Sequence, residues 1–412
     1  MKKVQFLLFL FLLNFHKSLK NFKQKKEYEK CGLKSFEKLL PEDYVSFDYD
    51  VETEDGYILK IFRLGKKNSE IDKENRPVVM FQHGYRHSGD AFLLLGKESG
   101  PLVLLEMGFD VWIGNNRGSR YGRRHKTLSN QNPEFWNFTW QDMAEFDLPA
   151  IFSLINTKTK QKINYIGHSQ GTTQMFAALS DKKTRKLITP FLNNFYALAP
   201  ALSIKRNKLG TFSKLSEILY PLSFFNSNLV EKLEKIDIKK CLAFGEDLLE
   251  LLELVCSQFP KYCLMIFSDT EKNVETINPE LVPKHLQRFF KIEPNFVSLY
   301  HFDQIMSCEE AEKKDCFSKY DRGVVGNLEA YDSFYTPKYN PELVKERIRM
   351  FAGEGDLIIS PEDAQADLEM FPNADIDLEK IPDWGHLAFI YAKDISDFYK
   401  KIGEDILQNK QE

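Results

Sequence analysis

The sequence predicts an α/β fold with a mostly parallel sheet that is interrupted by an inserted, mainly helical segment. Short apolar runs alternate with longer stretches of helical length between about residue 55 and residue 200. This alternation is typical of parallel strands joined by crossover helices that cover both faces of the sheet. It stops after Pro200 and resumes from about residue 340. We therefore expect one α/β domain that carries an insertion.

The expected strands are short apolar runs, as in a sheet that is buried on both faces. They are 78–81, 109–113, 163–166, 195–199, 348–352 and 376–381. Three stretches are long enough to be crossover helices: 92–107, 140–156 and 171–180. We expect the α/β core to comprise residues 19–200 and 321–412, with residues 201–320 inserted as a cap.

The composition is that of a globular protein with a large core. The chain has 412 residues, of which 43% are hydrophobic, and a chain of this length can bury a sizeable core. Its 56 basic and 60 acidic residues give a net charge of −4. Because no basic cluster is interleaved with aromatic residues, we expect no nucleic-acid partner. The cysteine and histidine spacings do not match a zinc site, and we expect no metal and no cofactor.

The first residues are typical of a secretory signal peptide. A short basic lead precedes the apolar run 4–13, and a bilayer-spanning helix would need about 20 apolar residues. A basic lead followed by a run of this length is typical of a signal sequence. We expect a signal peptide over residues 1–18, no transmembrane span in the mature chain, and a secreted or endolysosomal location. An uncleaved anchor or a plain buried helix is the alternative.

Cysteines are concentrated in the expected cap. Five of the six, at positions 241, 256, 263, 308 and 316, lie there, and the sixth is at position 31. Six cysteines allow 15 pairings, so we expect disulfides in this region without choosing among them. A glycosylation sequon begins at Asn137. Its aromatic neighbours predict that this asparagine is too buried to be used.

The segment Gly167-His168-Ser169-Gln170-Gly171 has the pattern G-x-S-x-G. It follows an expected strand and opens an expected helix, which is the context of a nucleophile elbow. Small residues on both sides relieve the crowding around a strained central serine. We therefore expect Ser169 to be a nucleophile rather than a residue of an ordinary tight turn.

A serine nucleophile needs a base, and the base needs a carboxylate to orient it. In folds with this elbow the chain order is serine, acid, histidine. Three histidines follow the serine, and His386 lies in a loop after the last expected strand. We expect His386 to be the base, and His285 and His301 to be surface or cap residues.

The acid is expected at a turn that follows a strand. Asp356 ends the segment 350–356, so its carboxylate would lie at the carboxyl end of the sheet, where ligands bind in such folds. Glu354 is the spare candidate, and a simple turn-capping role for Asp356 is the alternative. Asp147 precedes the serine, and we interpret it as a structural carboxylate.

Two backbone N–H groups are expected to bind the oxyanion of a tetrahedral intermediate. One belongs to Gln170, the residue after the nucleophile. The other comes from a loop after an early strand, where Gly84 lets the backbone approach closely, and we assign it to Tyr85. We expect His83 to orient this loop rather than to act as a base.

Further segments match a known family in the expected order. They are 53–59, 82–84, 112–118, 135–140, 167–173, 355–356 and 386–387. With them, residues 35 to 400 resemble the acid lipase family, which includes gastric and lysosomal lipases and steryl ester hydrolases, and the run 112–118 is the most specific match. The family usually has leucine where Tyr85 stands, asparagine where Gly385 stands and aspartate where Ala388 stands.

The resemblance implies an α/β-hydrolase core with a cap, a catalytic triad of Ser169, His386 and Asp356, and oxyanion donors at Tyr85 and Gln170. It implies hydrolysis of a lipid ester, a triacylglycerol or steryl ester, at a lipid–water interface. The apolar cap segments 219–225 and 248–255 would cover the acyl chain, although the second has the composition of a buried core helix. The alternatives are a small-ester esterase or acyltransferase with the same triad, and a non-catalytic lipid-binding protein of this fold.

Overall fold

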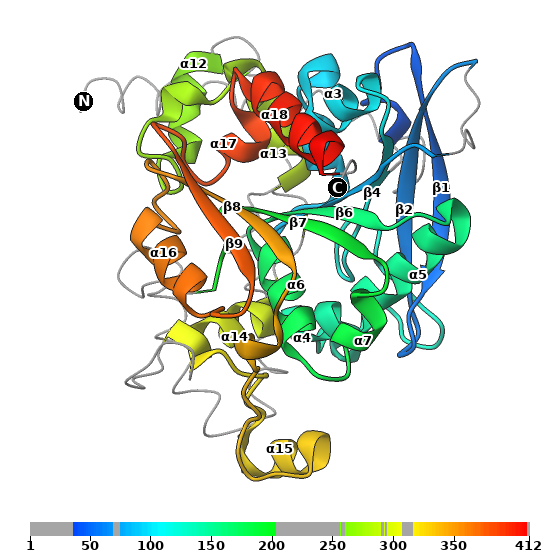
Figure 1. Cartoon of the computed structure of the whole chain (residues 1–412), viewed down its shortest axis with the longest axis vertical. Helices are drawn as coiled ribbons and strands as arrows, with labels where there is room; N and C mark the ends of the chain where they lie inside the picture. The colour runs from blue at the N-terminus through cyan, green and yellow to red at the C-terminus, as the bar shows by residue number, and fades with distance from the viewer. Residues whose placement is uncertain are drawn as a thin grey trace, which may run out of the picture.

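One twisted sheet runs through the structure, with helices on both of its faces (Figure 1). The computed structural model describes residues 36–68, 75–202, 256, 260–289, 292, 295–306 and 316–409. The strands are β1 (Tyr44–Glu52), β2 (Tyr57–Lys66), β3 (Val78–Gln82), β4 (Asp110–Ile113), β5 (Arg124–His125), β6 (Ile163–His168), β7 (Leu192–Leu198), β8 (Arg347–Gly353) and β9 (Asp375–Ile381).

The sheet is mostly parallel, as predicted. Its strand order is β1-β2-β4-β3-β6-β7-β8-β9, and β5 pairs with β2. The strands from β4 to β9 along this order are parallel, and they include all six of the expected runs. The antiparallel partners β1 and β2, which pair from Tyr44 with Lys66 to Glu52 with Ile58, form one edge.

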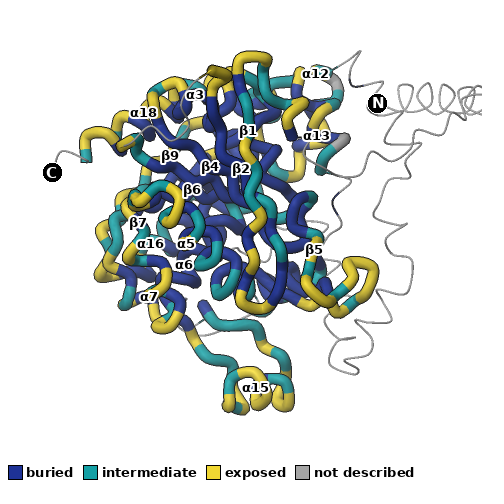
Figure 2. Tube along the Cα trace, turned by 90° about the vertical axis from the view of Figure 1, so that its right-hand side faces the viewer, coloured by how far each residue is buried: buried dark blue, intermediate teal, exposed yellow. Residues whose placement is uncertain are grey.

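Alternate residues of each central strand enter two separate hydrophobic cores. In β3, Val79 and Phe81 face the core beneath α3 (Gly100–Glu106), α17 (Ala388–Tyr391) and α18 (Ile395–Gln408). Val78 and Met80 face the core beneath α5 (Leu148–Thr159), α6 (Gln170–Ser180) and α16 (Pro361–Glu369). Because both faces are covered, the central strands are buried along their length (Figure 2).

Two of the three expected crossover helices differ from the prediction. The stretch 92–107 is broken into η1 (Gly89–Leu93), η2 (Gly96–Glu98) and α3, because Gly96 takes a left-handed conformation with φ 58° and the backbone is extended at Ser99. The stretch 140–156 is helical but contains a π-helical turn, η4 (Met143–Asp147), between α4 (Trp140–Asp142) and α5. The third expected helix corresponds to α6.

The described parts of the insertion are helical or turn-like. Its elements are α12 (Pro260–Cys263), η6 (Leu264–Phe267), η7 (Val274–Thr276), η8 (Pro279–Leu281), α13 (Val282–Phe289) and α14 (Phe296–Met306). The expected signal peptide and the apolar segments 219–225 and 248–255 lie outside the described residues. None of the helices in the described part of the chain is long and apolar enough to cross a membrane.

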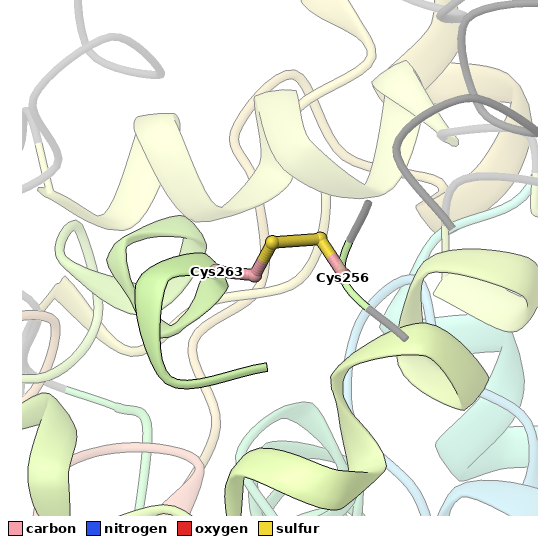
Figure 3. The surroundings of a disulfide bond; sticks show 2 residues. All are labelled: Cys256 and Cys263. Atoms are coloured by element: carbon pink, nitrogen blue, oxygen red, sulfur yellow. A yellow bond between two sulfur atoms is a disulfide. The ribbon is translucent and has the colours of Figure 1, made fainter. Parts of the chain in front are cut away.

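A disulfide joins Cys256 to Cys263 inside the insertion, within the region where disulfides were expected (Figure 3). The two cysteines are 7 positions apart. Their bond therefore anchors residue 256 to the end of α12. Cys316 is also disulfide-bonded.

The remaining elements are short or peripheral. They are η3 (Pro133–Trp136), α7 (Arg185–Ile188), α15 (Gly323–Tyr331) and η10 (Pro341–Leu343). The segment with α15 projects from the rest of the described chain (Figures 1 and 2). Directly after η3, Asn137 is exposed between buried Trp136 and Phe138, so the prediction that this asparagine is buried is wrong. Its two aromatic neighbours turn inward, and the asparagine between them faces solvent.

Candidate active site

Ser169 occupies a strained turn between β6 and α6. Its backbone has φ 53° and ψ −123°, a combination that costs free energy for a residue with a Cβ and is typical of functional turns. The flanking glycines are required by close packing. A Cβ on Gly167 would lie 2.8 Å from the carbonyl oxygen of Gly171, and a Cβ on Gly171 would lie 2.6 Å from that of Gln82. The two glycines therefore allow the tight turn that places Ser169 at the carboxyl edge of the sheet.

Ser169, His386 and Asp356 form one hydrogen-bonded chain. The Nε2 atom of His386 is 2.8 Å from Ser169 Oγ, and its Nδ1 atom is 2.9 Å from Asp356 Oδ2. These residues follow β6, β9 and β8, three parallel strands whose carboxyl ends meet at one edge. The side chain of Asp356 is fully buried.

The hydrogen bonds around Asp356 fix the direction of its carboxylate. Oδ1 accepts the backbone N–H groups of Ile358 and Ile359 at 2.7 and 2.8 Å, which leaves Oδ2 directed at His386. A carboxylate beside Nδ1 favours the tautomer with the proton on that atom. The Nε2 lone pair of His386 is then available to accept the Ser169 hydroxyl proton.

The loop after β3 lies against the nucleophile. A Cβ on Gly84 would be 2.9 Å from Ser169 Cβ and 3.2 Å from the carbonyl oxygen of His168, so only glycine fits without displacement. Tyr85 follows directly, and Gln170 is the first residue of α6. The first N–H groups of a helix have no partner within it. Both residues line a pocket of about 30 Å³, which is room for roughly one water-sized group.

Two buried histidines support this arrangement without acting as bases. His83 Nε2 accepts the N–H of Asn116 at 3.1 Å, and its Nδ1 lies 2.9 Å from the carbonyl oxygen of Gly84. Burial lowers the pKa of His83 to about 4 and that of His168 to about 3, so both rings are neutral. The ring of His168 contacts the carbonyl oxygen of His386 through Nε2 at 2.8 Å. This link between the two turns was not predicted from the sequence.

The other candidate residues lie away from this chain of hydrogen bonds. Glu354 is exposed. His285 and His301 were expected to be surface or cap residues; they lie in α13 and α14 of the expected cap, but neither is a surface residue, because both are buried. His285 Nδ1 lies 3.2 Å from the Tyr391 hydroxyl, and His301 stacks on Trp140 with ring centroids 3.8 Å apart.

Asp147 has the structural surroundings that were expected for it. It is fully buried and pairs with Arg117, whose Nε and backbone N–H donate to it at 2.8 and 3.0 Å. Arg117 also pairs with Asp55. The described residues contain no cluster of histidine, cysteine, aspartate or glutamate that could hold a metal ion.

Comparisons with known proteins identify the fold and the family of the chain. Residues 40–96 match the family model described as a partial alpha/beta-hydrolase lipase region, and residues 77–203 match that of the alpha/beta hydrolase fold. An alpha/beta hydrolase fold protein from Nakamurella multipartita superposes with a TM-score of 0.50 at 13% identity, covering 87% of this chain and 98% of its own. This likeness concerns the fold alone.

Sequence relatives are much closer. The gastric triacylglycerol lipase of Homo sapiens is 34% identical over 384 residues, which cover 88% of this chain and 89% of the relative. The lysosomal acid lipase/cholesteryl ester hydrolase of Macaca fascicularis is 30% identical, with 85% and 84% covered. Identity at this level over nearly the whole length shows the family. The chain therefore belongs to the acid lipase family of the α/β-hydrolases.

Proposed function

We propose that this protein is a serine lipase that hydrolyses neutral lipid esters, triacylglycerols or steryl esters, through an acyl-enzyme. The observation that carries the proposal is the hydrogen-bonded chain from Ser169 through His386 to Asp356, with links of 2.8 and 2.9 Å. Serine, imidazole and carboxylate in this order form the unit that activates a hydroxyl for acyl transfer. The substrate class is supported by the relatives, which are named as a triacylglycerol lipase and as an acid lipase/cholesteryl ester hydrolase.

In the first half-reaction, Ser169 Oγ attacks the ester carbonyl carbon while His386 Nε2 takes the hydroxyl proton. The tetrahedral oxyanion is stabilised by the backbone N–H groups of Tyr85 and Gln170, the two residues that line the small pocket described above. His386 then gives its proton to the leaving alkoxide, and the alcohol departs. Asp356 holds the imidazole in the required tautomer and stabilises the imidazolium that forms between these steps.

In the second half-reaction, His386 takes a proton from a water molecule, which attacks the acyl-enzyme. The oxyanion forms again at the same two N–H donors, and Ser169 leaves with its proton restored. In both half-reactions His386 is the group that takes up and releases the proton. The buried surroundings of Asp356 and His386 strengthen their interaction, because few water molecules compete for it.

The division of the chain belongs to the same proposal. Residues 1–18 act as a signal peptide, 19–200 and 321–412 form the catalytic core, and the cap 201–320 covers the acyl chain at a lipid–water interface. The location is secreted or endolysosomal. The relatives, a gastric and a lysosomal lipase by name, support this location.

Three substrates test the proposal: a long-chain triacylglycerol, a cholesteryl ester and a short-chain ester, each at pH 5 and pH 8. We expect long-chain hydrolysis that is lost in Ser169→Ala and retained in Ser153→Ala, a control at an exposed serine of α5. Hydrolysis of the short ester alone would replace lipase by esterase. Transfer of the acyl group to an added alcohol in preference to water would indicate an acyltransferase. Activity of Ser169→Ala within severalfold of wild type would overturn the site.

A further inference from the structure

A short strap from the insertion, residues 270–272, pairs with the turn that carries the candidate acid. The N–H of Lys272 donates to the carbonyl oxygen of Gly355 at 2.8 Å, and the N–H of Leu357 donates to that of Thr270 at 3.2 Å. These two bonds enclose an antiparallel bridge between Glu271 and Asp356. The two hydrogen bonds therefore hold the residues directly before and after Asp356, the candidate acid.

The same strap also contacts the turn that carries the candidate base. The N–H of His386 donates to the carbonyl oxygen of Thr270 at 3.4 Å. The side chain of Glu271 makes a shorter bond, since its Oε1 accepts the N–H of Leu387 at 2.6 Å. Three residues of the insertion thus join two turns that come from different strands, and Glu271 supplies the side-chain link.

Glu271 is enclosed by these turns. Only 1% of the residue is exposed, and a Cβ on Gly385 would lie 2.2 Å from its Oε2 atom. Oε2 has no hydrogen-bond partner among the side-chain contacts of the described residues. A buried ionised carboxylate without a partner is costly, whereas a neutral carboxylic acid is tolerated.

The charges around Glu271 also favour the neutral form. Burial raises the pKa of Glu271 to about 8, and the nearby negative charge of Asp356 adds to this effect, against the opposing hydrogen bonds from Leu387, Thr270 and Gly385. Of the titratable groups of the two turns that the strap contacts, Asp356 and His386 are buried, whereas Glu354 and Asp383 are exposed. The charged neighbours along the strap itself, Asp269 and Lys272, are exposed. Burial and the charge of Asp356 therefore favour the neutral carboxylic acid.

We propose that Glu271, as a neutral carboxylic acid, is a positioning residue that holds the His386 turn in line with Asp356 and Ser169. This inference rests on the proposed function of those three residues. Glu271 does not touch the reacting atoms. It acts through the N–H of Leu387, the residue next to the base. Ionisation would place a second negative charge beside Asp356 and disturb the alignment that the neutral form maintains.

The test compares Glu271→Ala and Glu271→Gln with wild type, using kcat and KM for a short-chain ester between pH 5 and pH 9. Misplacement of a reacting group by about 1 Å can cost on the order of 100-fold in rate. We expect Glu271→Ala to lose at least about tenfold in kcat at pH 6, with KM within about threefold. Glu275→Ala, at an exposed glutamate of η7, is the matched control and should behave as wild type.

Glutamine keeps the Oε1 acceptor and cannot ionise. Glu271→Gln should therefore retain most of the wild-type kcat at pH 6 and remain active at higher pH than wild type. Wild-type kcat in folded Glu271→Ala would overturn the inference. If Glu271→Ala does not fold, the inference is overturned instead when kcat of Glu271→Gln falls at the same alkaline pH as kcat of wild type. Ser169→Ala in the same assay separates the two proposals. If Ser169→Ala stays active, the proposed function fails. If Ser169→Ala is inactive while Glu271→Ala behaves as wild type, only this inference fails.

Discussion

Replacing Arg117 by methionine removes a buried cation that pairs with two carboxylates. Only 1% of its side chain is exposed. The guanidinium lies 2.7 Å from Asp147 through Nη2 and 2.6 Å from Asp55 through Nη1, and it stacks 4.1 Å from the centroid of the Tyr57 ring. Methionine has a similar length and no charge. The substitution therefore leaves Asp147 buried without its counter-ion.

The expected loss follows from that uncompensated charge. Breaking a buried ion pair by removing one partner costs about 3–5 kcal/mol. With an unfolding entropy of about 2.1 cal/mol/K per residue over 412 residues, we expect this loss to lower Tm by roughly 3–6 °C. Burial already raises the pKa of Asp147 to about 6, against the opposing effect of Arg117. A carboxyl whose pKa is raised on folding stabilises the protein at low pH and loses this contribution as pH rises through its folded pKa. Because Arg117→Met raises this pKa further, its deficit should be larger at pH 8 than at pH 5.

Urea and thermal unfolding at both pH values measure these losses. Arg124→Met is the matched control, because Arg124 pairs with Asp50 at a half-exposed site, with 48% and 47% of the side chains accessible. Such a pair is worth at most about 1 kcal/mol. Adding Asp147→Asn to Arg117→Met should recover part of the loss by removing the buried charge. A free energy of unfolding for Arg117→Met within about 1 kcal/mol of wild type, as for the control, would refute the reasoning.

Three further substitutions probe the site and the insertion. Gly84→Ala places a methyl group 2.9 Å from Ser169 Cβ, and we expect kcat to fall on the order of 100-fold. A wild-type kcat would show that the loop after β3 can move to make room without displacing Ser169. Tyr85→Phe removes a 3.0 Å hydroxyl bond to the insertion but keeps the N–H donor, so unfolding assays should show a loss of about 1 kcal/mol while turnover stays within severalfold. Abolished turnover would assign the hydroxyl a catalytic role. Cys256→Ser opens a disulfide spanning 7 positions and should cost about 2.5 kcal/mol, and an unfolding midpoint equal to wild type would contradict this.

The central strands could be predicted because they are buried on both faces. β3 and β6 are buried at every position and mostly apolar, as is typical of parallel strands between two helical layers. β1 was not predicted, because most of its nine residues are only partly buried and several are charged. Such an edge strand is defined by pairing with β2 rather than by its own composition.

The three residues of the proposed triad could be identified from the sequence for a related reason. Each follows a strand, and chain order limits the choice of base and acid. The contacts that hold these residues in place could not be predicted from the sequence. Glu271 bonds to Leu387 across 116 positions, and His168 bonds to His386 across 218. Contacts over such separations leave no local pattern, and the burial of His285 and His301 was missed for the same reason.

Labelling with a serine-reactive alkyl phosphonate tests the central claim most directly. The reagent phosphonylates a hydroxyl only where a base activates it, so the adduct identifies the nucleophile. Intact mass and peptide mapping should show one adduct, on Ser169, and none in Ser169→Ala. His386→Ala should slow labelling by on the order of 1,000-fold or more, because the triad acts as a unit. An adduct on another serine, or undiminished labelling of His386→Ala, would contradict the account.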